Sequence, residues 1–349
     1  MGCVEIVKSN RDPKGGTHMA GVPLSAVAAA AGVSTGTASR ALRGRGRVAP
    51  ATIARVQKKA EELGYFPNAV GKALRDGKSR TVGMLVPHLE NPFFVQLLRA
   101  AEEALHRYGY ELILADSRAD VELERRRLDL LLARQVDGII AIPAVFEQSA
   151  SAIAATAARV PLVQVDRMAG PKVADFVGLD NHASIDIVLR HIADAGAKDV
   201  LFIGVDDATS TGRERDDAMR TSEIGSEFAN VEFFRHQYTF ETGVTAIASL
   251  TNIPDAVICA DDLIAVGALG ELTRRGINVP REVMVTGFDG TVLAQVVEPQ
   301  LTTLAQPVEN MMEAAITQLF ARADLPADAP ATEQRFTGEL VLGSSTKTC

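Results

Sequence analysis

From Thr81 onward, short apolar runs alternate with stretches of helical periodicity, and this alternation restricts the fold more than any other feature. Strand–helix units of roughly 25–30 residues are typical of parallel sheets that helices cover on both faces. The runs are almost continuously apolar, as strands buried on two faces are. The predicted strands are 81–87, 110–116, 136–143, 160–167, 199–205, 231–238, 255–260 and 282–288.

The number of predicted strands is too large for one small sheet, and the pattern pauses near residues 176–180. We therefore predict an α/β core, 81–349, of two doubly wound lobes: 81–179 plus 308–334, and 180–305 plus 335–345. Helices are expected near 93–108, 121–134, 148–158, 182–195, 262–275 and 309–321, the last returning to the first lobe. Ligands of such folds bind between lobes, at the carboxyl ends of strands.

Residues 22–47 read VPLSAVAAAAGVSTGTASRALRGRGR and have a different pattern. A short helix with apolar periodicity runs into Gly32, which suits the left-handed backbone that ends a helix. Ser34 is a good N-cap for a second helix from Thr35 to about Leu42. Two helices joined by a tight glycine turn predict a helix-turn-helix unit. The alternative is an alanine-rich helical hairpin with a solvated basic end.

A third helix is predicted over 50–63, which completes a headpiece at 22–67 after a disordered tail at 1–21. Residues 68–80 are basic and weakly apolar, and predict a hinge that becomes helical only when docked. Leu74 is the one large apolar side chain of this hinge. It suits a wedge between base steps of a minor groove, or, in the alternative, a contact with the core.

The net charge of −8 is unevenly distributed along the chain. Residues 21–80 carry 11 Lys and Arg against 3 Asp and Glu, whereas residues 81–349 carry 22 against 39. A basic headpiece on an acidic core suits a protein that binds a polyanion at one end only.

Several protein classes are not expected. The chain has no apolar run long enough for a membrane span and no secretory signal pattern. Its three cysteines are far apart, which favours a reducing, cytoplasmic compartment without disulfides. No phosphate loop, catalytic triad or metal-ligand spacing is present, so we expect neither an enzyme nor a cofactor nor a metal site.

Polar side chains follow several predicted strands, and these are the candidates for the cleft. Strand ends carry Pro87, Asp116, Asp166 with Arg167, Asp261 with Asp262, and Asp289, while residues 91–94 and 210–215 lie in loops nearby. Carboxylates accept hydroxyl hydrogens, arginines donate to oxygens, and aromatic rings cover the apolar side of a sugar. The set predicts a polyol-binding cleft, although each Asp alone is equally well explained as a helix cap.

The chain resembles the lactose-repressor/galactose-repressor (LacI/GalR) family of bacterial transcription regulators. The resemblance spans about 22–345 and rests on VAAAAGVSTGTASRAL (27–42), VQKKAEELGYFPNAVGKALR (56–75), VGMLVPHLENPFF (82–94), QVDGIIAIP (135–143), ICADDLIAVGAL (258–269) and INVPREVMVTGFD (277–289). It implies a repressor, acting as a homodimer on a pseudo-palindromic double-stranded DNA operator and controlled by a small effector such as a sugar or sugar acid.

The resemblance also implies roles for individual residues. The DNA-binding set is Ser34, Thr35, Gly36, Thr37, Arg40, Arg43, Arg47, Asn68 and Leu74. The effector-binding set is Phe93, Phe94, Asp166, Arg213, Arg215, Asp261, Asp262 and Asp289.

Two departures from the family pattern stand out. Gly36 occupies a position where many members read a base with a side chain, and the segment 216–240, which borders the cleft, is short. A soluble sugar-binding protein without DNA regulation would fit the core but would leave the basic headpiece unexplained.

Overall fold

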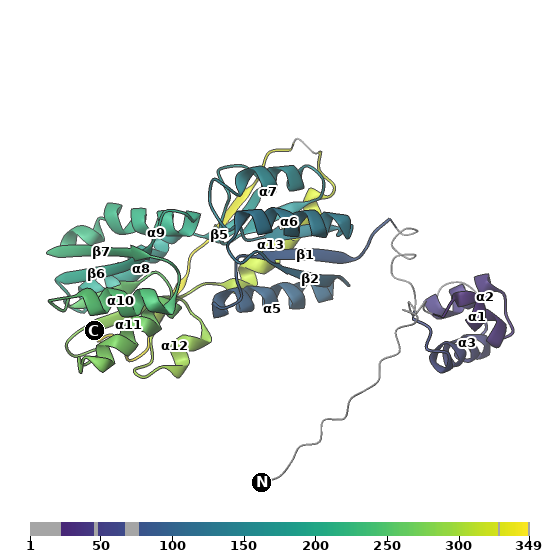
Figure 1. The fold of residues 1–349 in the computed structure, drawn as a ribbon, viewed down its shortest axis with the longest axis horizontal. Helices are drawn as coiled ribbons and strands as arrows, with labels where there is room; N and C mark the ends of the chain where they lie inside the picture. Colours follow the sequence, from purple (N-terminus) through teal and green to yellow (C-terminus); the bar gives the residue numbers. More distant parts are fainter. Residues whose placement is uncertain (1–21, 45–47, 67–76, 327–328, 348–349) are drawn as a thin grey trace, which may run out of the picture. The chain divides into compact units, whose positions relative to one another are not determined.

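The computed structural model describes residues 22–44, 48–66, 77–326 and 329–347. The chain divides into two compact units, residues 1–77 and residues 78–349 (Figure 1). The predicted tail at 1–21, together with Arg47, Asn68 and Leu74, lies outside the described residues.

Three helices form the headpiece, as the sequence predicts: α1 (Leu24–Ala30), α2 (Thr35–Arg43) and α3 (Pro50–Glu62). Gly32 adopts φ +65° in the turn between α1 and α2. The Ser34 Oγ caps α2 by accepting a hydrogen bond from the Thr37 N–H at 3.1 Å. The helices share a small apolar core, made of Val27, Ala28, Ala31, Ala38, Ala41, Val56 and Ala60.

Residues 78–349 contain two six-stranded sheets, one in each lobe. The first has the order β11-β5-β4-β3-β1-β2 and consists of β1 (Thr81–Val86), β2 (Glu111–Asp116), β3 (Gly138–Ala141), β4 (Leu162–Val165), β5 (Asp175–Leu179) and β11 (Glu333–Phe336). The second has the order β12-β10-β9-β8-β6-β7 and consists of β6 (Asp199–Val205), β7 (Asn230–His236), β8 (Ala256–Cys259), β9 (Met284–Asp289), β10 (Thr302–Ala305) and β12 (Glu339–Val341). All pairs are parallel except β10 with β12.

Helices cover both faces of each sheet (Figure 1). In the first lobe, α5 (Pro92–Arg107) and α13 (Val308–Arg322) share a core on one face, while α6 (Val121–Ala133) and α7 (Ala150–Ala157) share a core on the other. In the second lobe, α8 (Asn181–Asp194) packs on α9 (Ser210–Thr221), and α10 (Phe240–Ser249) packs on α11 (Asp262–Arg274). The 3-10 helix Ile224–Glu227 and α12 (Val292–Val296) complete this lobe.

The chain crosses between the lobes three times: after β5, after β10 and after β11. The second crossing brings α13 onto β3, β4 and β5, so the predicted return of this helix to the first lobe is confirmed. The third crossing follows Phe336, because β11 pairs with β5; the predicted boundary at residue 335 was therefore slightly early.

Three expectations from the sequence were wrong in detail. The pause at 176–180 falls within β5, a strand, and β10, β11 and β12 were also missed. Residues 210–215, expected in a loop, form the first turns of α9. Phe93 and Phe94 are likewise buried in the first turn of α5.

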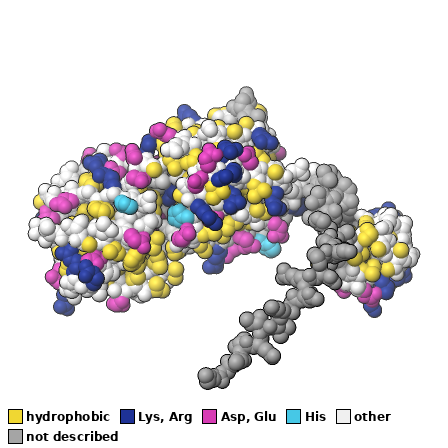
Figure 2. Space-filling view, in the orientation of Figure 1, with side chains coloured by type: hydrophobic (Ala, Val, Ile, Leu, Met, Phe, Trp, Pro, Cys, Tyr) yellow, Lys and Arg dark blue, Asp and Glu magenta, His cyan; other side chains and the backbone are white. Residues whose placement is uncertain are grey.

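Within the described part of the chain, every helix is too short or too polar to cross a membrane. The same residues hold no group of three or more His, Cys, Asp and Glu side chains placed to bind a metal ion. Acidic and basic side chains are interspersed over the visible face of residues 78–349 (Figure 2).

Candidate functional site

One face of α2 is polar and exposed, while the opposite face fills the headpiece core. Thr35, Gly36 and Arg40 are exposed on this face. The Thr37 Oγ1 lies 2.9 Å from the Ser34 Oγ and accepts a hydrogen bond from an Arg40 Nη at 3.4 Å. Hydroxyls and a guanidinium in a row along an exposed helix are groups that contact bases and phosphates in a major groove.

The remaining predicted DNA contacts are less fully placed. Arg43 is the last residue of α2, and Gly44, with φ +62°, follows it as the helix cap. Arg47, Asn68 and Leu74 are outside the described residues, so their roles stay predictions.

A narrow cavity lies between the two lobes, at the carboxyl ends of the strands. Five of the predicted effector residues line it together: Phe93, Phe94, Asp166, Arg215 and Asp289. Four further lining residues were not in the effector-binding set that the resemblance implied: Asn91, Arg167, Thr211 and Tyr238. The space that a water-sized molecule can occupy among them measures about 10 Å³. This is far below the roughly 300–1,000 Å³ of sites for drug-sized ligands, so the two lobes must move apart to admit a ligand.

The two lining aspartates have unusual backbone conformations. Asp166 follows β4 with φ +63°, and Asp289 ends β9 with φ +106°. Residues other than glycine rarely adopt positive φ angles, and residues that are held in this conformation cluster at functional sites. Burial raises the pKa of the Asp166 carboxyl, although Arg167 and Arg215 oppose the shift. Burial also raises the pKa of Asp289 well above its usual value, again against Arg215.

Arg215 is held by the protein on several sides. Its Nε donates to the Asn181 Oδ1 at 2.9 Å, and its Nη1 donates to the Ala260 carbonyl oxygen at 2.5 Å. Its guanidinium lies 3.8 Å from the centre of the Phe288 ring, and its Nη2 lies 3.7 Å from the Asp289 Oδ1. Arg215 therefore organises the second lobe's wall of the cavity.

Asp261 and Asp262 were predicted to bind the effector, but neither lines the cavity. The Asp261 carboxylate caps α11 by accepting from the Ile264 N–H at 2.7 Å, and it also accepts from the Asn91 Nδ2 at 3.0 Å. Burial raises its pKa to about 7. The Asp262 carboxylate accepts from the Thr291 N–H, the Thr291 hydroxyl and the Thr303 hydroxyl at 2.6, 2.9 and 2.6 Å. Both aspartates thus have structural partners.

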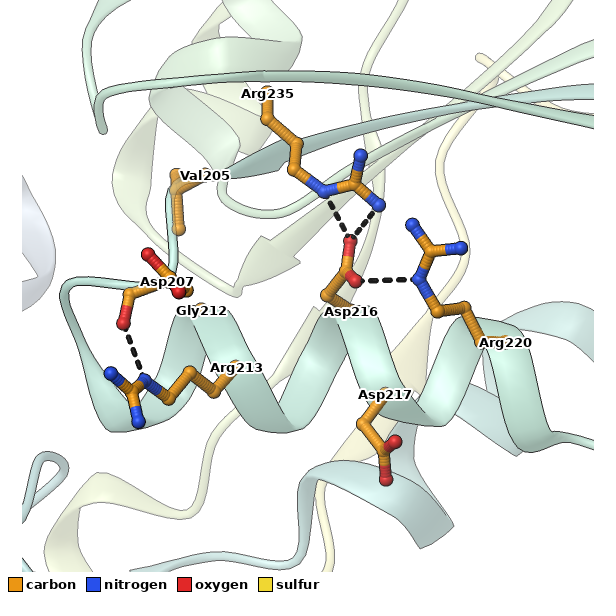
Figure 3. A pocket seen from close by; sticks show the side chains of 8 residues that line it. All are labelled: Val205, Asp207, Gly212, Arg213, Asp216, Asp217, Arg220 and Arg235. Carbon is orange, nitrogen blue, oxygen red and sulfur yellow. Dashed lines mark hydrogen bonds and ion pairs between the residues drawn. The ribbon is translucent and has the colours of Figure 1, made fainter.

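Arg213 lies instead beside a second, larger cavity of about 400 Å³ on the surface of α9 and β7 (Figure 3). Its arginines are already paired: Arg220 Nε and Arg235 Nη2 contact the Asp216 carboxylate at 2.8 and 2.6 Å. Arg213 Nη1 lies 3.3 Å from the Glu147 Oε1 of the first lobe. Since these charges neutralise one another at the surface, we take the smaller inter-lobe cavity as the candidate ligand site.

Several hydrogen bonds join the lobes around this cavity. The Asn91 side chain reaches Asp261, the Gln96 Nε2 donates to the Gly290 carbonyl oxygen at 3.3 Å, and the Met168 N–H donates to the Ser210 Oγ at 3.0 Å. On the outer side, the Phe146 N–H donates to the Ala208 carbonyl oxygen at 2.7 Å. These few contacts are what a change in lobe arrangement would break.

Of the four further lining residues, Asn91, Arg167 and Thr211 lie in the stretches that the sequence marked as cleft candidates, whereas Tyr238 does not. Asn91 caps α5, with its Oδ1 accepting from the Phe93 N–H, and Arg167 directly follows a predicted site residue. Thr211 lies on α9, a helix that the sequence pattern did not predict. Tyr238 follows β7 at the end of a predicted strand, and nothing in its local pattern marks it as a cavity residue.

Comparison with known proteins gives two family matches. Residues 24–68 match bacterial regulatory proteins of the lacI family, and residues 189–346 match the periplasmic binding protein-like domain. The HTH-type transcriptional repressor CytR of Escherichia coli (strain K12) is 31% identical over 288 residues, covering 80% of this chain and 84% of CytR. The HTH-type transcriptional regulator MalR of Streptomyces coelicolor is 32% identical, covering 93% of this chain and 96% of MalR.

Solved structures give the same picture of the fold. The lac repressor dimer bound to operator and the anti-inducer ONPF aligns with a TM-score of 0.82 at 22% identity, covering 94% of this chain and 100% of that one. The transcriptional regulator CelR in complex with cellobiose aligns with a TM-score of 0.67 at 27% identity, covering 93% of this chain and 99% of that one. Both matches include the headpiece and the two lobes.

Proposed function

Because this chain belongs to the LacI family of bacterial regulatory proteins, we propose that it is a repressor that binds a specific operator and is controlled by a small hydroxylated ligand. The observation that carries the proposal is the pairing of an exposed hydroxyl–arginine face on α2 with a closed polar cavity in a separate two-lobed unit.

The DNA side of the proposal rests on α2. Ser34, Thr35, Thr37 and Arg40 would contact bases and phosphates, with Arg43 and Arg47 on the flanking backbone. A homodimer would place two such helices on the two halves of a pseudo-palindrome. The lac repressor, similar in fold, is a dimer on its operator. The hinge residues Asn68 and Leu74 would order on DNA, with Leu74 as the wedge.

The ligand side rests on the inter-lobe cavity. Phe93, Phe94, Asp166, Arg215 and Asp289 would contact the ligand, as the resemblance implies. A ligand that prefers one lobe arrangement shifts the population toward it, and changes DNA affinity by the difference in its binding free energy to the two states. CelR, 27% identical to this chain, binds cellobiose in its solved complex, which supports a sugar or sugar derivative.

The test begins with operator selection from a random DNA library, followed by titration by fluorescence anisotropy. We expect Arg40→Ala to weaken binding to the selected operator by roughly 10- to 100-fold, because it removes a charged contact from the groove. Arg159→Ala removes the same charge from an exposed position of the core and is the matched control. DNA binding that is absent, or that does not weaken as salt rises, would favour the alternative of a sugar-binding protein without DNA regulation.

A further inference from the structure

Among the described residues that line the cavity, Arg167 is an arginine whose side chain has no hydrogen-bond acceptor in the protein. Arg167 is only 5% exposed and lines the cavity directly after Asp166. Its guanidinium lies 5.4 Å from the centre of the Phe94 ring and 5.1 Å from the centre of the Tyr238 ring. Phe94 belongs to the first lobe and Tyr238 to the second, so Arg167 lies where the two lobes meet.

Among the described residues, no atom accepts a hydrogen bond from the Arg167 side chain, and its Nε is buried without a partner. The Asp166 Oδ2, 3.7 Å from that Nε, is too far for a hydrogen bond. A guanidinium has five N–H donors in a fixed planar fork, and leaving buried donors unpaired is unfavourable. Arg215, by contrast, is engaged by Asn181 and the Ala260 carbonyl.

The charges in the cavity leave room for one anion. Asp289 is occupied by the protein, since its Oδ1 accepts from the Gln306 Nε2 at 2.8 Å and lies beside Arg215. Arg215 is likewise engaged by the protein, so Arg167 is the lining cation whose donors stay free for an anionic group of a ligand.

We propose that the ligand of this regulator is a small polyhydroxy acid, such as a sugar acid, whose carboxylate pairs with Arg167 while a hydroxyl donates to Asp166. The proposal rests on the regulator function above and narrows its ligand class. A carboxylate matches the planar fork of a guanidinium and carries one charge. A phosphate ester carries about −1.5 to −2 at neutral pH and would meet two carboxyl groups, Asp166 and Asp289, in the same cavity.

This pairing also gives a route from ligand to lobe arrangement. The Arg167 guanidinium contacts the Tyr238 ring of the opposite lobe, so a carboxylate that fixes the guanidinium also fixes a contact between lobes. An aromatic face attracts a desolvated cation, and this attraction is strongest when water is excluded.

The proposal is tested on the full chain by thermal unfolding with matched neutral and acidic probes at equal ionic strength. The probes are glucose, gluconate, glucuronate and glucose 6-phosphate, and the corresponding galactose series. We expect at least one carboxylic acid to raise the melting temperature, while its neutral parent and its phosphate do not. No stabilisation by any acid, or stabilisation by a neutral sugar or phosphate in preference to the acids, would overturn the proposal.

Variants then assign the contact. Arg167→Gln is expected to weaken binding of the acid by roughly 100-fold, because a buried charge pair loses one partner. Arg167→Lys, which keeps the charge but not the fork, should fall between Gln and wild type. Arg159→Gln, which removes an exposed charge, should bind as wild type does. Equal affinity of wild type and Arg167→Gln for the acid would contradict the assignment.

Stability and DNA binding separate this inference from the regulator function. Without ligand, Arg167→Gln should melt close to wild type, since it removes unpaired buried donors together with the contacts to Asp166, Phe94 and Tyr238. If that variant fails to fold, the comparison of probes on the wild type still decides the ligand class. Operator binding measured without ligand tests the regulator function alone. If the protein did not bind an operator, the regulator function would be contradicted, but the proposal that the ligand is an acid would not.

Discussion

Gly36 shows how a single residue carries functional information that the fold does not require. It is the second residue of α2, and its φ is not in the left-handed region. A Cβ built there meets only the Ser34 Oγ, at 3.9 Å. Glycine in a helix is less stable than alanine by roughly 1 kcal/mol, so the headpiece retains a residue that its own packing does not need. Close approach of the α2 backbone to base edges would explain it.

Gly36→Ala is accordingly expected to stabilise the headpiece by about 0.5–1 kcal/mol and to weaken operator binding several-fold. Amide hydrogen exchange in the full chain measures the stability of the headpiece, and fluorescence anisotropy measures binding to the selected operator. Gly270→Ala is the control, because Gly270 is also helical and its nearest neighbour is the Phe240 Cζ at 3.9 Å. The control should gain similar stability and leave operator binding unchanged; tighter operator binding by Gly36→Ala would refute the close approach.

At the scale of elements, the N-terminus of α11 joins two strands of the second sheet. Asp262 accepts hydrogen bonds from Thr291, which follows β9, and from Thr303 in β10. Asp262→Ala leaves these buried donors unpaired, and we expect a loss of about 3 kcal/mol in the free energy of unfolding. Urea denaturation measures it, with exposed Asp324→Ala as the control. A loss below about 0.5 kcal/mol would show that the donors find other partners.

Asp261, the residue before Asp262, predicts that the free energy of unfolding depends on pH. Burial raises the pKa of Asp261 to about 7, and the neighbouring Asp262 adds to the shift while Arg215 and Arg167 oppose it. The folded state therefore binds a proton that the unfolded state has released, so stability is greatest at low pH and falls as pH rises from about 4 to 7. Asp261→Asn, which keeps the helix cap, should gain stability relative to wild type over this window. Parallel pH profiles of the two proteins would contradict the shift.

The same elements explain what the sequence could predict. The strands β1, β3, β6 and β8 are buried on both faces and read as apolar runs, so alternation with helices was sufficient. The strand β10 was missed because two of its buried residues, Thr302 and Thr303, are polar and do not form an apolar run. Their hydroxyls are hydrogen-bonded to Thr346 and Asp262 inside the protein. The helix α9 was missed for a related reason, since Ser210, Thr211 and Arg215 are polar and buried at the lobe boundary.

The candidate site was predictable where a residue follows an apolar strand. Asp166 and Asp289 do so, and the cavity contains both. The importance of Arg167 could not be read from the pattern, because only three-dimensional contacts show that its buried Nε has no hydrogen-bond acceptor. Asp261 and Asp262 were placed in the cleft on the same strand-end rule, yet their carboxylates face buried donors within the protein.

At the scale of the whole core, one exposed ion pair joins the lobes outside the cavity. Arg213 contacts Glu147 at 3.3 Å, and its guanidinium lies 4.6 Å from the Phe146 ring centre. Glu147→Gln should weaken the closed arrangement slightly, and exchange of the Phe146 amide, which donates across the lobes, should accelerate about two- to fivefold. Glu103→Gln breaks a pair within α5 and should leave that amide unchanged. Equal exchange in both variants would exclude Arg213 from lobe closure.

The last crossing has a consequence for synthesis. The strand β11 borders the first sheet and β12 borders the second, and both are made within the final stretch of the chain. During synthesis both sheets therefore lack an edge strand until the segment that contains β11 and β12 has been translated. A stop codon just ahead of Glu333 would expose the edges of β5 and β10 together, so truncation at this point damages both lobes of the core at once.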